Sequence, residues 1–325
     1  MSRVLVTGAT GLIGTNLVPV LEAAGHDVLP FSLRGWTGEA FPEGIDAVVN
    51  LAGKAHDLDG TASPDVYRRI NTDLAERVYA AFLDSSATTF VQLSSVAAVN
   101  EESVDGTLDE SAEPHPVTPY GKSKLAAERL LLAVEPPAGR RVVILRPTMV
   151  HGPGDKGNLR LLFGMLSRGI PYPLDAYANE RSFVSIGNLA WTVTSVIETP
   201  TIPTGIYLVA DDEPVSTGHL VTLIAEVTGR PVRRLAIPRP VVRAVARLGD
   251  HVPLVPLNSR RLAKLTEDYR VSGARLLAAL GRDRMPIATD DGLRSSIAAL
   301  AAERGTSGGS ADAQPARRLP EADDR

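Results

Sequence analysis

Short apolar runs and longer amphipathic stretches alternate through the first half of the chain. Five short runs predict β-strands, over residues 3–7, 26–31, 46–51, 89–93 and 141–145. Apolar residues at helical spacing follow the first run and recur over two long stretches, 63–83 and 120–134. Apolar strands that alternate with amphipathic helices are typical of a parallel sheet covered on both faces. We therefore predict an α/β fold with a doubly wound, Rossmann-like parallel sheet.

The pattern departs from a regular doubly wound fold at two places. Only 14 residues, 32–45, separate the second and third runs, which is short for the usual connection. We expect one element to be missing there. Pro19 falls inside the first predicted helix, where it removes a backbone hydrogen bond and is expected to kink the helix.

The second half of the chain is less regular. Beyond Thr148, short elements are separated by Pro and Gly, and we expect residues 151–302 to form a smaller mixed region on the edge of the sheet. Residues 303–325 are rich in Gly, Ser, Ala, Pro and charge, so they cannot bury enough apolar surface to become ordered. We predict a disordered tail over these residues.

Composition narrows the function classes. Apolar residues make up 44% of the 325 residues and charged residues 22%, which is ordinary for a globular protein. The net charge of −4 gives no footprint for nucleic acid or for an anionic membrane. There are no cysteines, which excludes disulfides and thiolate metal sites, and we expect no metal. No leader-like or membrane-spanning run is seen, so we expect a cytoplasmic protein.

A glycine-rich turn directly follows the first predicted strand. It has the spacing G-x-x-G-x-x-G, at Gly8, Gly11 and Gly14, and a helix follows it. Glycines allow a tight turn and a close approach of the backbone to a pyrophosphate, and the helix N-terminus offers free N–H groups. Residues 1–150 are therefore interpreted as a dinucleotide-binding domain with contacts continuing to about residue 200, and the phosphate-binding set includes Leu12 and Ile13.

The choice between NAD and NADP depends on the end of the second strand. A carboxylate there would bind the adenosine ribose diol, whereas an arginine would favour a 2′-phosphate. Ser32 and Arg34 occupy this segment, and no carboxylate does. We favour NADP, with NAD as the open alternative and Arg34 as a solvated loop residue in that case.

A tyrosine and a lysine stand four residues apart where the helix over 120–134 begins. Positions i and i+4 share a helix face, so the Lys124 ammonium is expected to favour the phenolate of Tyr120 and lower its pKa. Ser94 and Ser95 end the fourth strand, at the edge where α/β sheets bind ligands. A serine there can hydrogen-bond a reacting oxygen while Tyr120 transfers its proton.

Taken together, seven segments resemble the extended short-chain dehydrogenases/reductases, specifically the nucleotide-sugar epimerase/dehydratase group typified by UDP-glucose 4-epimerases. The resemblance covers roughly residues 3–300. The segments are Thr7-Gly-Ala-Thr-Gly-Leu-Ile-Gly14, Asn50-Leu-Ala-Gly53, Tyr67-Arg-Arg-Ile-Asn71, Leu93-Ser-Ser95, Tyr120-Gly-Lys-Ser-Lys124, Leu145-Arg-Pro-Thr-Met-Val-His-Gly-Pro153 and Arg181-Ser-Phe-Val184.

The resemblance implies roles for individual residues. Ser95, Tyr120 and Lys124 would be the catalytic triad, with Lys124 also holding the nicotinamide ribose. The remaining implied site residues are Leu51, Ala52 and Gly53 along the cofactor, Asn71 in support, Pro147 and Thr148 near the nicotinamide, and Asn158 and Arg181 at the substrate diphosphate. The resemblance also implies a homodimer formed through the helix that carries Tyr120 and the helix over 65–82.

The sequence also departs from the family pattern. His151 stands where a tyrosine is usual, and we interpret it as structural. Asn50 replaces a frequent histidine, and the missing insertion leaves the adenine pocket undefined. His56 is interpreted either as an edge of the substrate pocket or as a loop residue with no ligand.

The predicted activity is 4-epimerisation of a nucleotide sugar through a transient 4-keto sugar, with hydride and proton transfer at C4. A 4-keto-sugar-nucleotide reductase using the same three residues is the first alternative. The residues disfavour a dehydratase, because Ser95 is followed by Val and Ala rather than by Asp and Glu. A non-catalytic dinucleotide sensor is the second alternative, since a fold alone does not imply chemistry.

Overall fold

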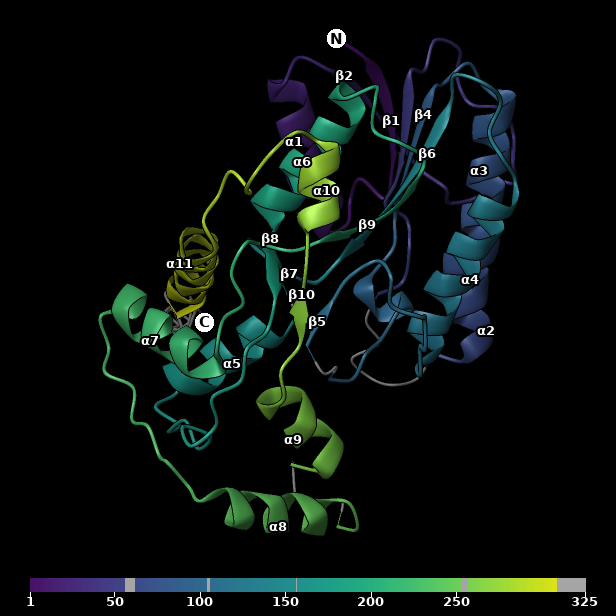
Figure 1. Ribbon diagram of the computed structural model, residues 1–325. Helices are drawn as coiled ribbons and strands as arrows, with labels where there is room; N and C mark the ends of the chain where they lie inside the picture. The colour runs from purple at the N-terminus through teal and green to yellow at the C-terminus, as the bar shows by residue number, and fades with distance from the viewer. Residues whose placement is uncertain (56–61, 104–105, 156, 253–256, 309–325) are drawn as a thin grey trace, which may run out of the picture.

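A parallel six-stranded sheet forms the centre of the molecule. The computed structural model describes residues 1–55, 62–103, 106–155, 157–252 and 257–308 (Figure 1). The strand order is β2-β1-β3-β4-β6-β9, and every neighbouring pair is parallel. The strands are β1 (Arg3–Thr7), β2 (Asp27–Phe31), β3 (Ala47–Asn50), β4 (Thr89–Leu93), β6 (Arg141–Pro147) and β9 (Gly205–Val209). The predicted doubly wound α/β sheet is confirmed, and β9 is a sixth strand that the apolar runs did not indicate.

Helices cover both faces of this sheet, as Figure 1 shows. Because side chains alternate along a strand, Val4 and Val6 pack on one face and Leu5 on the other. The face of Val4 is covered by α1 (Leu12–Ala23), α6 (Ile186–Glu198) and the short α10 (Ala274–Ala279). The face of Leu5 is covered by α3 (Leu74–Asp84) and α4 (Pro119–Ala133). Pro19 lies inside α1, as the sequence indicated.

The connection between β2 and β3 contains neither a helix nor a strand, which confirms the missing element. Three aromatic rings lie there instead. Trp36 and Phe41 stack with ring centroids 5.9 Å apart, and Phe31 meets each of them edge-on. This cluster joins the core beside β2, so aromatic packing replaces the usual helix at this edge of the sheet.

The second half of the chain builds a smaller region around its own apolar core. That core gathers apolar residues of α5, α7, α8 and α11. The elements of this region are β7 (Met149–His151), β8 (Phe183–Ser185), β10 (Arg270–Val271), α5 (Asn158–Ser167), α7 (Thr217–Thr228), α8 (Arg239–Gly249), α9 (Ser259–Thr266) and α11 (Thr289–Gly308), and the first half of the chain adds β5 (Thr107–Leu108). Two small parallel pairs, β7 with β8 and β5 with β10, hold it together. Helix α11 continues to Gly308, past residue 303 where the sequence suggested a tail, and residues 309–325 lie outside the described part.

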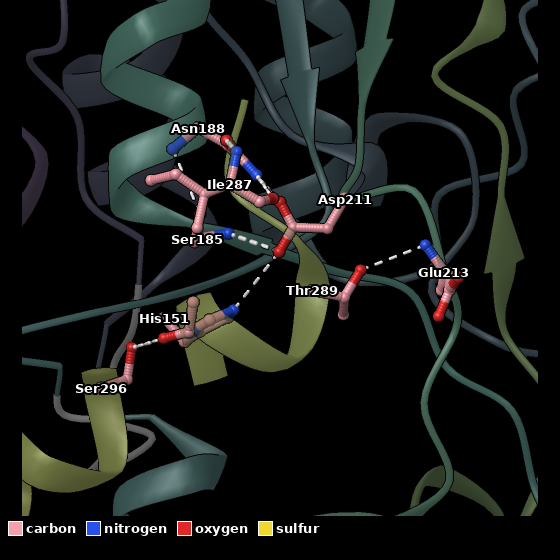
Figure 2. Close-up of polar contacts among 9 residues, drawn as sticks. His151, Ser185, Asn188, Asp211, Glu213, Ile287, Thr289 and Ser296 are labelled. Atoms are coloured by element: carbon pink, nitrogen blue, oxygen red, sulfur yellow. Dashed lines mark hydrogen bonds and ion pairs between the residues drawn. The ribbon is translucent and has the colours of Figure 1, made fainter. Parts of the chain in front are cut away.

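A buried polar network joins this smaller region to the end of β9. The Asp211 carboxylate accepts hydrogen bonds from the Ser185 backbone N–H (3.0 Å) and the Asn188 side-chain amide (2.7 Å). His151 lies between Asp211 (Nε2 to Oδ2, 3.6 Å) and Ser296 of α11 (Nδ1 to Oγ, 2.8 Å), as Figure 2 shows. Because both contacts of His151 are with buried side chains, Asp211 and Ser296, we keep its interpretation as a structural residue.

No helix in the described ranges is both long and apolar enough to cross a membrane.

Candidate active site

The glycine turn after β1 is packed so closely that side chains do not fit. Gly8 has φ of +67°, in the left-handed region, and a Cβ there would lie 2.8 Å from the backbone N of Ala52. A Cβ on Gly14 would lie 2.5 Å from the Ala9 Cα. The turn therefore requires glycine at both positions, and it brings β1 and α1 against the segment that follows β3.

The N-terminus of α1 is open to an anion. Gly11 is the N-cap residue, and no side chain in the described structure caps the helix. The first turn also lacks an acidic side chain, so the N–H groups of Leu12 and Ile13 remain available. Together with the glycine turn, this open helix end fits a pyrophosphate.

Lys124 places a buried cation beside the carboxyl ends of β3 and β4. Its side chain is buried, and Nζ donates a hydrogen bond to the Leu93 carbonyl oxygen at 3.0 Å. Nζ also lies 3.1 Å from where a Cβ on Gly53 would stand, so the absence of a side chain at Gly53 leaves room for it. Burial lowers the pKa of Lys124 to about 8, with the Glu128 carboxylate opposing part of this shift.

Tyr120 stands one turn before Lys124, at the start of α4. Thr118 caps the helix by accepting from the Gly121 N–H, and the Glu101 carboxylate accepts from the Thr118 N–H (2.7 Å) and hydroxyl (2.6 Å). The ring of Tyr120 meets the Tyr67 ring edge-on, with centroids 6.2 Å apart.

The expected lowering of the Tyr120 pKa by Lys124 is wrong for this structure. Burial raises the pKa of Tyr120, and a hydrogen bond with the Ser95 hydroxyl offsets part of the rise. The Lys124 ammonium is directed to the Leu93 carbonyl and is not among the groups that shift this pKa. The hydrogen bond does, however, bring Ser95 and Tyr120 together as predicted.

Asn71 connects the segment after β3 to α4. It lies in a π-helical turn, η1 (Arg68–Asp73), between α2 (Pro64–Tyr67) and α3. Its side-chain amide donates to the Lys54 carbonyl (3.0 Å) and the Ser123 hydroxyl (3.0 Å), while its Oδ1 accepts from the Lys54 N–H (2.8 Å). π-turns of this kind often occur at functional sites, because they redirect a side chain out of the helical register.

A buried ion pair behind Lys124 is the main feature that the sequence analysis missed. The Glu128 carboxylate accepts from Arg146 at both Nε (2.9 Å) and Nη2 (2.6 Å) and also from the Ser94 hydroxyl. Both charged side chains are buried. Glu128 lies four residues after Lys124, so the same i, i+4 spacing that pointed to the Tyr–Lys pair indicated a third polar group on this face.

The remaining predicted cofactor residues lie at two places. Leu51 and Ala52 follow β3, while Pro147 ends β6 and Thr148 follows it, so all four are at the carboxyl edge of the sheet. The Thr148 hydroxyl is buried and has no hydrogen-bond partner among the described residues, which leaves it available to a ligand. Ser32 and Arg34 lie in the exposed loop after β2. A hydrogen bond from the Arg34 backbone N–H to the Ser32 hydroxyl (3.3 Å) links them.

The predicted substrate residues are not joined to the Tyr120 group by any hydrogen bond within the described ranges. Asn158 begins α5 and is exposed. Arg181 donates from Nη1 to the Glu267 carbonyl (3.1 Å), and its guanidinium lies over the Tyr269 ring at 5.4 Å. His56 lies outside the described residues.

A cavity of about 580 Å³ lies in the second half of the molecule, and Asn158, Arg181 and Tyr120 are not among its lining residues. Its lining includes residues of α8 and α9 together with Glu267 and Asp268. Arg181 contacts this rim through Glu267.

The arrangement is a Rossmann-like α/β fold in which Ser95, Tyr120 and Lys124 gather at the carboxyl edge of the sheet, beside a glycine turn. The model of the NAD dependent epimerase/dehydratase family matches residues 4–203. The chain therefore belongs to this family, it is an enzyme, and the resemblance to the extended short-chain dehydrogenases/reductases is confirmed.

Named relatives and a solved structure agree with this assignment. The chain is 33% identical over 257 residues to a Vibrio cholerae protein named UDP-glucose 4-epimerase, covering 72% of this chain and 78% of that protein. It is 34% identical over 170 residues to GDP-6-deoxy-D-mannose reductase of Pseudomonas aeruginosa, covering 47% and 54%. It also resembles the structure of RMD from Pseudomonas aeruginosa complexed with NADPH, with a TM-score of 0.72 and 23% identity over 93% of this chain and 100% of that one.

The buried lysine predicts a pH-dependent difference in stability. Between pH 8 and 10.5 the folded protein binds fewer protons at Lys124 than the unfolded chain does, so the free energy of unfolding rises with pH. From pH 8 to pH 10.5, the free energy of unfolding of the wild-type protein should rise by about 3 kcal/mol more than that of Lys124→Met. Urea unfolding at several pH values measures the difference. Lys122→Met, which removes an exposed lysine, is the control, and its free energy of unfolding should change with pH as that of wild type does. A difference between wild type and Lys124→Met that does not change with pH would contradict the buried ammonium.

Proposed function

We propose that this enzyme is an NAD(P)-dependent nucleotide-sugar 4-epimerase that acts through a transient 4-keto sugar. The observation that carries the proposal is the grouping of Ser95, Tyr120 and Lys124 at the carboxyl edge of β4, beside a glycine turn and an open helix N-terminus. When bound, a nicotinamide dinucleotide accepts a hydride from C4 of the sugar and returns it.

The residues at the sheet edge would hold this cofactor. Backbone N–H groups of the glycine turn suit its pyrophosphate, and Lys124 suits the hydroxyls of its nicotinamide ribose. The unpartnered Thr148 hydroxyl and the closely packed segment at Gly53 fit the same ligand. Asn71 supports the site by fixing Lys54 against α4.

Tyr120 and Ser95 would carry the proton chemistry. Tyr120, in its phenolate form, would remove the proton from the sugar 4-hydroxyl, and Ser95 would donate a hydrogen bond to the same oxygen. Once the 4-keto sugar has turned over, Tyr120 would return the proton to the 4-oxygen, which gives the 4-epimer without net redox change. Residues 151–302 would bind the substrate, with Asn158 and Arg181 at its diphosphate.

A reductase of a 4-keto sugar nucleotide is the second candidate. It is favoured by the relative named GDP-6-deoxy-D-mannose reductase and by the fold match to RMD with NADPH. The same three residues would serve it, but reduced cofactor would be consumed. A non-catalytic sensor would bind the cofactor and show no turnover.

The test of the proposal is turnover by the purified protein and by Tyr120→Phe. The protein is incubated with UDP-glucose, UDP-N-acetylglucosamine or a 4-keto-deoxy sugar nucleotide while the reduced cofactor is followed by absorbance. An epimerase gives product with no net absorbance change, and Tyr120→Phe should lower kcat by about 10³-fold while cofactor still binds.

The matched control is Tyr79→Phe, which removes a phenol that donates to the Val134 carbonyl at the other end of the α3–α4 pair. This variant should keep wild-type turnover. Net oxidation of the cofactor would select the reductase, and full activity in Tyr120→Phe would refute both catalytic candidates.

We further propose that NADP is preferred over NAD, because Arg34 is exposed in the loop after β2 and can meet a 2′-phosphate. Arg34→Ser should weaken NADPH binding by about tenfold and leave NADH binding unchanged. Fluorescence titration measures both constants, and Arg282→Ser, which removes another exposed arginine, is the control. Equal loss for both cofactors would contradict the preference.

We also propose a homodimer formed through α3 and α4. Leu130, Leu132 and Val134 are exposed on and just after the last turn of α4, which leaves apolar surface for a partner copy. Light scattering at increasing protein concentration should give twice the chain mass. A monomer mass at every concentration would rule the dimer out.

A further inference from the structure

The cavity of about 580 Å³ beside α8 and α9 is lined mainly by polar side chains, and four of them are arginines. Figure 1 shows the two helices at the end of the molecule farthest from the central sheet. Arg239, Arg243 and Arg247 of α8 are four residues apart, so they lie on one face of the helix, and all three line the cavity. Arg270 of β10 adds a fourth guanidinium group. A cavity of this size is large enough to hold a small molecule.

The arginines of α8 keep their charge without an acidic partner. Within the described part of the chain, the side chains of Arg243 and Arg247 form no hydrogen bond or ion pair. Arg239 donates from Nε to the Ala176 carbonyl oxygen (3.0 Å) and lies over the Tyr177 ring at 5.2 Å, so neutral groups hold it in place. Like charges one helical turn apart repel each other, and an anion bound between them removes this repulsion.

Arg270 carries a buried donor that no group of the described structure satisfies. Its Nε is buried and has no hydrogen-bond partner among the described residues. Its Nη1 and Nη2 reach the carboxylates of Glu180 and Asp268 only at 3.4 Å and 4.0 Å. Buried N–H groups in proteins usually have a hydrogen-bond partner, and a ligand in the cavity would supply one.

The charge around the cavity is opposite to that of the whole chain. Residues 230–265 contain nine Arg and Lys residues and a single acidic residue, Asp250. The whole chain has 34 Arg and Lys against 38 Asp and Glu. Asp250 is already engaged, because its carboxylate accepts from the Ser259 N–H (2.9 Å) and hydroxyl (2.6 Å). The chain therefore concentrates positive charge at this cavity.

Two carboxylates in the cavity distinguish it from a site for a simple anion. Glu267 and Asp268 line it, and among the described residues neither forms an ion pair with an arginine of α8. Glu267 accepts from the Ser103 hydroxyl (2.6 Å), and Asp268 accepts from the Glu180 N–H (2.8 Å), so both are held in place. A fixed carboxylate beside a phosphate site accepts hydrogen bonds from ribose hydroxyls.

We propose that this cavity binds a nucleoside diphosphate, with its phosphates on the arginines and its ribose on Glu267. A guanidinium group suits phosphate because its N–H groups fork onto two oxygens, and a row of arginines serves more than one phosphate. The diphosphate belongs either to a nucleotide sugar or to a free nucleoside diphosphate. Asn158 and Arg181 do not line the cavity, so the proposal adds new residues to those already considered for a diphosphate. It does not rest on the proposed function.

Isothermal titration calorimetry of the full-length protein with UDP, pyrophosphate and uridine tests the proposal. Saturating NADP is present in each titration, so that the glycine turn is not the site observed. UDP and pyrophosphate should bind, whereas uridine should bind much more weakly because it has no phosphate. High salt should weaken the binding of UDP by screening the arginines. Combined Arg243→Ser and Arg247→Ser should raise the Kd of UDP at least ~tenfold.

The matched control removes the same amount of charge elsewhere. Combined Arg282→Ser and Arg284→Ser replaces two exposed arginines that do not line the cavity, and it should leave the Kd of UDP unchanged. Circular dichroism checks that each variant folds. An equal Kd for UDP in wild type and in the variant at Arg243 and Arg247 would overturn the proposal, as would wild-type protein that binds neither UDP nor pyrophosphate.

Steady-state kinetics with a nucleotide sugar distinguishes the two sources of the diphosphate. A raised KM with unchanged kcat in the variant at Arg243 and Arg247 assigns the diphosphate to the bound substrate. An unchanged KM together with weakened UDP binding assigns it to a free nucleoside diphosphate. Because calorimetry requires no turnover, an inactive protein would refute the proposed function and leave the binding result valid.

Discussion

A buried ammonium at the carboxyl edge of the sheet is the constraint around which the site is organised. Removing the Lys124 charge from water is costly, and the surrounding structure compensates with the Leu93 carbonyl and the Glu128 carboxylate. Glu128 is in turn held by Arg146 of β6 in a two-point ion pair. These contacts fix α4 against β4 and β6, and the position of Tyr120 follows from the position of α4.

A second set of contacts fixes the same helix from the other side. Asn71 in the π-helical turn bonds both Lys54 and Ser123, so the segment after β3 and the helix that carries Lys124 are held together. The segment after β3, where we propose that the cofactor binds, and the helix that carries Tyr120 and Lys124 are thus held together by the same hydrogen bonds. Catalysis is faster when the reacting groups are already held in the right geometry before the reaction.

The sequence predicted what depends on local periodicity. Apolar runs located β1, β2, β3, β4 and β6, and the four-residue spacing of Tyr120 and Lys124 put both on one helix face. The sequence pattern could not predict contacts between residues that are distant along the chain. The partner of Glu128, Arg146, is on strand β6, 18 residues away, and no periodicity reveals that pairing. The pKa of Tyr120 was misjudged for a related reason, because burial by the surrounding tertiary structure outweighs a neighbouring charge that points elsewhere.

The two halves of the molecule carry different information. The sheet half is set by the family fold, while the second half contributes its own core, the cavity beside α8 and α9 and a local positive charge. The net charge of the whole chain conceals this local positive charge, although the arginine spacing on α8 is visible in the sequence. Under the proposed function, substrate binding is therefore to be sought in residues 151–302 and the chemistry in Ser95, Tyr120 and Lys124.

The most direct test of the central claim follows the hydrogen at C4. A nucleotide sugar deuterated at that carbon, such as UDP-glucose, is converted by the wild-type protein and the product is analysed by mass spectrometry and NMR. Our account predicts that the 4-epimer keeps deuterium at C4, because the hydride leaves and returns within one site. A 4-epimer that carries hydrogen from the solvent at C4 would contradict it.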